Sequence, residues 1–208
     1  IDALREAGLT LLPIAVACNK PPSRAVSGGA SNAERTSAAE ATARGNPPRA
    51  ANDAPNAAGY RWRSVKMGGG GFVSGLVPSR TRAGLWYART DVGGAYRSAD
   101  AGHTWVPLLD WVSDEETGFL GVESIALDPS APERLYLLVG ISYFNGGKSA
   151  ILRSNDFGQN FDVADVSAQF TAHGNGMGRQ SGERLAVDPN DGKVLFSGTR
   201  SKGLFRSS

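Results

Sequence analysis

An internal repeat constrains the fold of this chain more than any other feature of its sequence. The same short pattern ends at Ser98, Ser154 and Ser207, which are 56 and 53 residues apart, and it reads AYRS, ILRS and LFRS. An apolar run precedes each copy, and a segment ending in proline (GLVP, ALDP or AVDP) precedes each run. A period near 50 residues that holds about four short strands is typical of a β-propeller blade. We therefore predict an all-β fold built from blades of four antiparallel strands.

The first two repeats continue into a turn signature, the Asp-box, which reads Ser-x-Asp-x-Gly-x-x-Trp. Residues 98–105 (SADAGHTW) match it fully, residues 154–161 (SNDFGQNF) match it with Phe for Trp, and a third would begin at Ser207. In such a turn the aspartate accepts hydrogen bonds from its own loop, and the glycine takes a positive φ. We therefore assign a structural role to eight signature positions, Ser98, Asp100, Gly102, Trp105, Ser154, Asp156, Gly158 and Phe161.

The N-terminal residues 1–18 have the pattern of an export signal. Arg5 precedes a short apolar stretch, which at about ten residues is too short to span a bilayer. Residues 15–18 (AVAC) resemble a bacterial lipobox, which makes Cys18 a candidate for lipidation and a lipid anchor. A plain signal peptide with an incidental cysteine is the alternative. In either case we expect a bacterial protein that is secreted, or held at the cell surface or in the periplasm as a lipoprotein.

A change of composition separates a linker from the repeat region. Residues 19–58 consist mainly of small and polar residues and hold almost no large apolar side chain, which predicts a disordered linker. Aromatic and β-branched residues then appear in short runs separated by glycine, proline and asparagine. The predicted propeller domain, which is incomplete, therefore occupies residues 59–208.

Charge and residue counts exclude several kinds of partner. The formal net charge is only +2, and the 22 Lys and Arg residues are scattered among 20 acidic residues, which argues against nucleic-acid binding. The single cysteine cannot form an internal disulfide. His103 and His173 show no metal-ligand spacing. We expect no metal, no cofactor and a monomer.

Strand connectivity predicts which loops share a face of the propeller. We place the strands of the first blade at residues 72–77, 85–90, 95–97 and 105–109. Antiparallel pairing then puts the Asp-box at one end of the blade and Asp91, in the turn between the second and third strands, at the other.

The face that carries Asp91 has a composition suited to sugar binding. Aromatic rings bury the apolar faces of pyranose rings, while carboxylates handle protons and hydroxyl groups. The substrate-binding candidates are Trp111, Tyr143 and Phe144; the same loops hold Phe119, Asp110, Asp114, Glu115 and Glu116. These residues alone leave alternatives open. The spacing alone favours a plain turn former at Asp91, and Trp111 and Tyr143 are equally compatible with core positions.

Several long strings outside the Asp-boxes resemble glycoside hydrolase family 74, the xyloglucanases. They are residues 68–73 (GGGGFV), 87–97 (YARTDVGGAYR), 107–112 (PLLDWV), 121–124 (GVES) and 182–189 (GERLAVDP). The resemblance implies that the blades are part of a seven-bladed propeller, which faces a second one across an open cleft. It also implies internal or chain-end cleavage of β-1,4-glucan backbones that carry xylose, so that xyloglucan or a related β-glucan is the expected polysaccharide substrate.

The resemblance further implies a mechanism. The family inverts the anomeric carbon with two aspartates, and its general base lies in the motif that Asp91 matches, so Asp91 is the catalytic candidate. An inverting pair of carboxyl groups is separated by about 6.5–9.5 Å. We expect the general acid beyond residue 208, and we expect the fragment alone to be inactive and poorly stable because its strand edges are open. The loop at residues 113–117 departs from the family by lacking a further tryptophan.

Two other classes of Asp-box propeller are alternatives. A non-catalytic, sortilin-like propeller that binds protein or polysaccharide would keep the boxes but would need no acid at Asp91. A sialidase would need an arginine cluster around the carboxylate of its substrate. Arginines are available for such a cluster, but the strings around them resemble the xyloglucanases; they are Arg89, Arg97, Arg153, Arg179 and Arg184.

Overall fold

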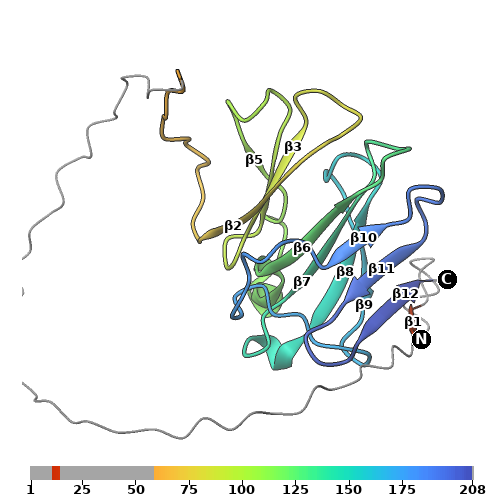
Figure 1. Ribbon diagram of the computed structural model, residues 1–208. Helices are drawn as coiled ribbons and strands as arrows, with labels where there is room; N and C mark the ends of the chain where they lie inside the picture. The colour runs from red at the N-terminus through yellow and green to blue at the C-terminus, as the bar shows by residue number, and fades with distance from the viewer. Residues whose placement is uncertain (1–10, 15–58, 208) are drawn as a thin grey trace, which may run out of the picture. The chain divides into compact units, whose positions relative to one another are not determined.

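The computed structural model of the chain describes residues 11–14 and 59–207 (Figure 1). Cys18, the predicted linker at 19–58 and most of the predicted export signal lie outside the described residues. In the described part, Val65 to Ser207 and the strand at residues 11–14 belong to one compact unit.

Three antiparallel sheets of four strands form this unit, which confirms the predicted all-β architecture. The first sheet contains β2 (Val73–Pro78), β3 (Trp86–Thr90), β4 (Ala95–Ser98) and β5 (Val106–Pro107). The second contains β6 (Val122–Leu127), β7 (Leu135–Gly140), β8 (Ser149–Ser154) and β9 (Asp162–Asp165). The third contains β10 (Leu185–Val187), β11 (Leu195–Gly198), β12 (Leu204–Ser207) and β1 (Leu11–Ile14). Two short 3-10 helices, η1 (Asp114–Leu120) and η2 (Asn145–Gly147), lie in the connecting loops.

Two strands differ from the sequence-based expectation. The fourth strand of the first blade was expected at residues 105–109 but covers only Val106–Pro107, because Trp105 belongs to the Asp-box turn and Leu108 turns into the core. The fourth strand of the third sheet is β1, which pairs antiparallel with β12 from Leu11 opposite Ser207 to Ile14 opposite Leu204. The edge of β12 offers unpaired backbone groups, and a short extended segment satisfies them.

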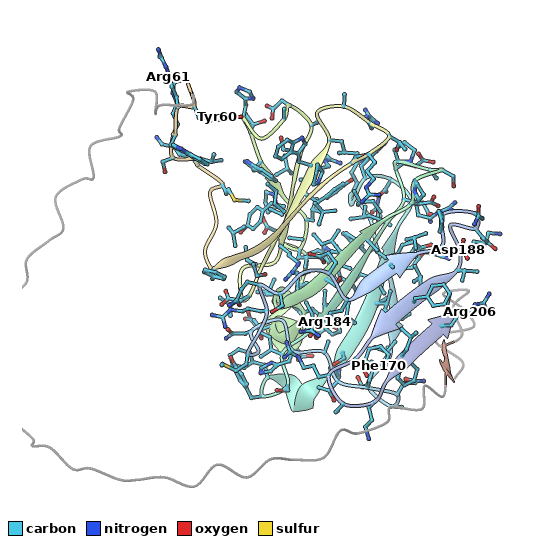
Figure 2. All side chains as sticks on the ribbon, in the orientation of Figure 1. Tyr60, Arg61, Phe170, Arg184, Asp188 and Arg206 are labelled. Carbon is cyan, nitrogen blue, oxygen red and sulfur yellow. The ribbon has the colours of Figure 1, made fainter. Side chains whose placement is uncertain are left out.

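The second sheet is apolar on both of its faces because it packs between the other two. All six residues of β7 are buried. Leu135, Leu137 and Val139 pack toward the first sheet, whereas Tyr136 and Leu138 pack toward the third. Alternating side chains point to opposite faces of a strand, so a continuous apolar run is what such a central position requires. Phe170, labelled in Figure 2, joins the core toward the third sheet.

Candidate active site

Asp91 lies in the tight turn between β3 and β4, at the end of β4 opposite to the Asp-box, as predicted. The Thr90 hydroxyl closes this turn, because it donates to the Gly94 carbonyl at 2.9 Å and accepts from the Gly93 N–H at 2.8 Å. Gly94 has a φ of 81°, and a Cβ on Gly93 would collide with the Gly70 carbonyl. The turn that carries Asp91 therefore requires a positive φ at Gly94 and the absence of a side chain at Gly93.

The Asp91 carboxylate is nearly buried, and both of its oxygens have partners. The residue is 7% exposed. Its Oδ1 accepts a hydrogen bond from the backbone N–H of Phe72 at 2.7 Å. Its Oδ2 lies 3.1 Å from Nε of Arg179, in an ion pair whose N–H is not aligned for a hydrogen bond. Two contacts therefore hold the Asp91 carboxylate at a loop-bearing end of the first sheet.

Arg179 reaches Asp91 from the loop between β9 and β10, which connects the second sheet to the third. Its guanidinium group also lies over the Phe72 ring, 5.3 Å from the ring centroid. Its backbone carbonyl accepts a hydrogen bond of 2.9 Å from Nη1 of Arg89 on β3. Phe72, next to the first sheet, and Arg179, from the loop between the second and third sheets, thus both contact the Asp91 carboxylate.

Arg89 and Glu183 form the ion pair beneath this cluster. Arg89 is fully buried, and its Nε donates to Oε1 of Glu183 at 2.7 Å. Its other donors reach the Ser74 hydroxyl at 2.8 Å and the Gly182 carbonyl at 3.2 Å. Oε2 of Glu183 accepts from Ser124 Oγ at 2.8 Å and from the Ile125 N–H at 2.6 Å. Glu183 therefore joins the first sheet to the second.

A second ionic cluster surrounds Glu123, which is 3% exposed. Its Oε1 lies 3.1 Å from Nε of Arg184 and 2.9 Å from Nε of Arg200. Its Oε2 accepts from the His173 backbone N–H at 2.6 Å. Burial and the Arg200 charge lower the pKa of His173, although Glu123 opposes this shift. The Ser142 N–H lies 3.3 Å from His173 Nδ1 and donates to it, as a neutral imidazole allows.

Tyr143 and Phe144 present two aromatic rings on the loop between β7 and β8, at the same end of the strands as Asp91. Tyr143 is 59% exposed and Phe144 is 44% exposed, so neither is a core residue. Their ring centroids lie 5.0 Å apart, and the His173 ring meets Tyr143 edge-on at 5.4 Å. Asn175 Nδ2 donates to the Tyr143 hydroxyl at 2.6 Å. These contacts fix an exposed aromatic surface that can stack on a sugar ring.

Trp111 and Phe119 occupy different surroundings from Tyr143. The Trp111 ring is 45% exposed and lies 6.2 Å from Phe161, the aromatic position of the second Asp-box. With Leu108 and Gly158 it lines a shallow surface cavity. Phe119 is buried in the core between the first two sheets, so the expectation that it contributes to a sugar-binding face is wrong. The structure places Trp111 beside the second Asp-box, and its role in substrate binding stays a prediction.

The two Asp-boxes share one hydrogen-bond pattern. Ser98 Oγ donates to Asp100 Oδ1 at 2.7 Å and accepts from the Gly102 N–H at 2.8 Å; Ser154 makes the same bonds to Asp156 and Gly158, both at 2.8 Å. The Thr104 hydroxyl and backbone N–H donate to the Asp100 carboxylate. In the second box the side-chain amide and backbone N–H of Asn160 donate to the Asp156 carboxylate. These donations lower the pKa of both aspartates. Each carboxylate therefore accepts several hydrogen bonds from its own turn.

Sequence reasoning did not assign Arg89, Arg179 or Glu183 to the Asp91 cluster. Arg89 and Arg179 were considered only as arginines that a sialidase would need. A usable signal was Arg89 itself, a charged residue within the buried strand WYART. Because a buried charge needs partners, such a position indicates that an acid from elsewhere in the chain packs against it.

Residues 11–14 and 59–207 contain neither a metal-binding cluster nor a membrane-spanning helix. Within these ranges no group of three or more His, Cys, Asp and Glu side chains could hold a metal ion. The same ranges contain no helix of the length and hydropathy needed to cross a membrane.

Comparison with known proteins gives consistent relatives. No family model matches the chain. Xyloglucanase Xgh74A of Acetivibrio thermocellus is 44% identical over 166 residues, 77% of this chain and 19% of the relative. The oligoxyloglucan-reducing end-specific xyloglucanase of Emericella nidulans is 44% identical over 148 residues, 71% of this chain and 18% of the relative. The crystal structure of the GH74 enzyme of Niastella koreensis matches with 57% identity and a TM-score of 0.64, over 69% of this chain and 21% of that one. The chain spans about one fifth of the length of these relatives.

Proposed function

The chain is a homologue of the GH74 xyloglucanases over part of their length, and from this premise we propose that the protein hydrolyses xyloglucan. The observation that carries the proposal is the Asp91 carboxylate. It follows β3 within a string typical of the family, and Phe72 and Arg179 hold its two oxygens. The exposed rings of Tyr143 and Phe144 at the same end of the strands support a carbohydrate substrate.

The proposed reaction is hydrolysis with inversion at the anomeric carbon. Asp91 takes a proton from a water molecule as the water oxygen attacks C1 on the face opposite to the leaving group. A general acid, proposed to lie outside this sequence, protonates the glycosidic oxygen as its bond to C1 breaks. The new hemiacetal therefore has the α configuration, whereas the bond that was cleaved was β. The proposal covers internal and chain-end cleavage alike.

The proposed location is outside the cytoplasm. The apolar stretch after Arg5 and the AVAC segment support export, and Cys18 supports a lipid anchor. Cleavage before Cys18 would remove β1, so the exported form is proposed without that strand. Labelling cells with a radioactive fatty acid tests the anchor. Wild-type protein should take up the label, and the Cys18→Ser variant should not. Equal labelling of the two proteins would contradict lipidation at Cys18.

The test of the proposed reaction uses the full-length gene product and xyloglucan, with reducing ends as the readout. Removal of a general base typically lowers the rate by about 10²–10⁴-fold. We expect this loss of kcat for Asp91→Asn, with an unchanged melting temperature. Asp162→Asn is the control, because Asp162 lies on β9 in an exposed ion pair with Arg153. A wild-type protein that binds xyloglucan but releases no reducing ends would favour the non-catalytic, sortilin-like alternative.

A further inference from the structure

The proposed mechanism gives Asp91 a role but leaves the arginine beside it without one. We propose that Arg179 is a positioning residue, which fixes the plane of the Asp91 carboxylate, and that the buried Arg89–Glu183 pair fixes Arg179 in turn. The proposal rests on the proposed role of Asp91 as the general base. Arg179 and Glu183 lie on the loop between β9 and β10, whereas Arg89 lies on β3, the strand that precedes Asp91.

Two fixed points are needed to orient a carboxylate. The torsion between Cβ and Cγ of an aspartate is broad, so one hydrogen bond to Oδ1 still allows the other oxygen to swing. The Phe72 N–H supplies the first point at 2.7 Å, and Arg179 Nε supplies the second at 3.1 Å from Oδ2. The Arg179 guanidinium also contacts the Phe72 ring. Phe72, Asp91 and Arg179 thus contact one another pairwise.

The position of Arg179 is itself determined by its backbone. Its carbonyl accepts the 2.9 Å hydrogen bond from Arg89, and its loop is turned by Gly178, with a φ of 73°. Arg89 is fully buried and directs its donors at Glu183, Ser74, Gly182 and Arg179. A buried guanidinium is tolerated only with such a set of acceptors, which holds it in one orientation. Movement of the Arg179 backbone would therefore break one of the four hydrogen bonds that hold the buried Arg89 charge.

Arg184 provides a matched control within the same loop. Its Nε lies 3.1 Å from Glu123 Oε1, and its side chain is 29% exposed. Arg179 has the same ion-pair distance and the same exposure, but its partner is Asp91. Arg184 is labelled in Figure 2. Loss of either side chain removes an ion pair of the same length, but Glu123 keeps Arg200 as a partner, and only Arg179 contacts the proposed base.

The consequence for catalysis follows from geometry. A misplacement of about 1 Å in a reacting group lowers the rate by about 100-fold. We expect Arg179→Ala to lower kcat for xyloglucan by about 100-fold with KM changed by less than about threefold, because substrate contacts are kept. Arg184→Ala should keep the wild-type kcat. A cooperative melting transition for both variants checks that each keeps the fold.

The experiment is a kinetic comparison of these variants in the full-length gene product, with Arg179→Lys and added guanidinium ion as rescue. Arg179→Lys should recover part of the lost kcat, and guanidinium should raise the kcat of Arg179→Ala but not of Asp91→Asn. If Arg179→Ala and Arg184→Ala have equal kcat while Asp91→Asn is inactive, the positioning role is wrong and the proposed base stands. If Asp91→Asn is fully active, the role of Asp91 as the general base is wrong, and with it the positioning role of Arg179. If the wild type releases no reducing ends from xyloglucan, the proposed function itself fails.

Discussion

Arg89 and Glu183 stand 94 positions apart in the sequence, and their Nε and Oε1 atoms lie 2.7 Å apart in the structure. The second oxygen of Glu183 holds Ser124 and Ile125, so one side chain connects elements of two sheets. Among residues 11–14 and 59–207, the three sheets share no strand pairing with one another. Ion pairs of this kind, together with the apolar core, therefore determine how adjacent sheets are held.

Replacement of Glu183 by Gln should destabilise the protein. The variant leaves the buried Arg89 charge without its counter-ion, and breaking a buried pair in this way lowers the free energy of unfolding by about 3 kcal/mol. Thermal melting of the full-length gene product measures the effect. Asp162→Asn removes the 2.8 Å ion pair with Arg153 at an exposed site, where such a pair contributes about 0–1 kcal/mol. Equal melting temperatures for Glu183→Gln and Asp162→Asn would show that the Arg89–Glu183 pair does not stabilise the fold more than an exposed ion pair does.

The turn after Asp91 should tolerate no side chain at its first glycine. A Cβ on Gly93 would collide with the Gly70 carbonyl, whereas a Cβ on Gly70 would meet nothing within 4 Å. We expect Gly93→Ala to destabilise the fold by about 1–3 kcal/mol, in the range of an overpacked site. Gly70→Ala, the matched control, should melt like the wild type. Both melting temperatures are measured by calorimetry, and a Gly93→Ala variant as stable as Gly70→Ala would contradict the close contact.

The second Asp-box should make stability depend on pH in the acid range. Burial acts to raise the pKa of Asp156, but donations from Asn160, Ser154 and Gln159 outweigh it and lower the pKa to about 2. The unfolded pKa is about 3.9, so the stabilisation is full above that pH and is lost as the pH falls through the folded value. We expect Asp156→Asn to melt below the wild type at neutral pH. That difference should narrow between about pH 4 and about pH 2. A melting-temperature difference between the variant and the wild type that stays constant across this pH range would contradict a stabilising role of the ionised Asp156 carboxylate.

The exposed Tyr143 ring should contribute to substrate affinity. An aromatic contact of this kind is worth about 0.5–1.5 kcal/mol, so we expect Tyr143→Ala to raise KM for xyloglucan by about threefold to tenfold. Tyr143→Phe keeps the ring and loses only the hydrogen bond from Asn175, so its KM should stay near the wild-type value. Initial-rate kinetics distinguish the two variants. An unchanged KM for Tyr143→Ala would remove Tyr143 from the substrate-binding surface.

The local architecture was predictable from the sequence because it repeats. The recurring Arg-Ser pattern predicted the third strand of each sheet, and alternate strand directions placed Asp91 and the Asp-box at opposite ends of β4. The Asp-box turns follow from residues only a few positions apart. The hydrogen bonds of such a turn depend on the order of neighbouring residues and not on contacts with another sheet, so the sequence is enough to predict them.

Contacts between sheets were not predictable in the same way. Nothing periodic connects Arg179 with Asp91, or Trp111 with Phe161, because each contact depends on how a long loop folds back. Phe119 was expected on a binding face, but η1 turns its ring into the core. The pairing of β1 with β12 reflects an open edge that the repeat pattern does not describe.

Asp91 is proposed as the general base of an inverting hydrolysis. The reaction of Asp91→Ala with xyloglucan in the presence of azide, followed by NMR of the product, tests this role. Azide needs no base, so the variant should lose hydrolysis and recover cleavage with azide, and the product should be an α-glycosyl azide. An Asp91→Ala enzyme that hydrolyses xyloglucan like the wild type, or that forms a β-glycosyl azide, would contradict the claim.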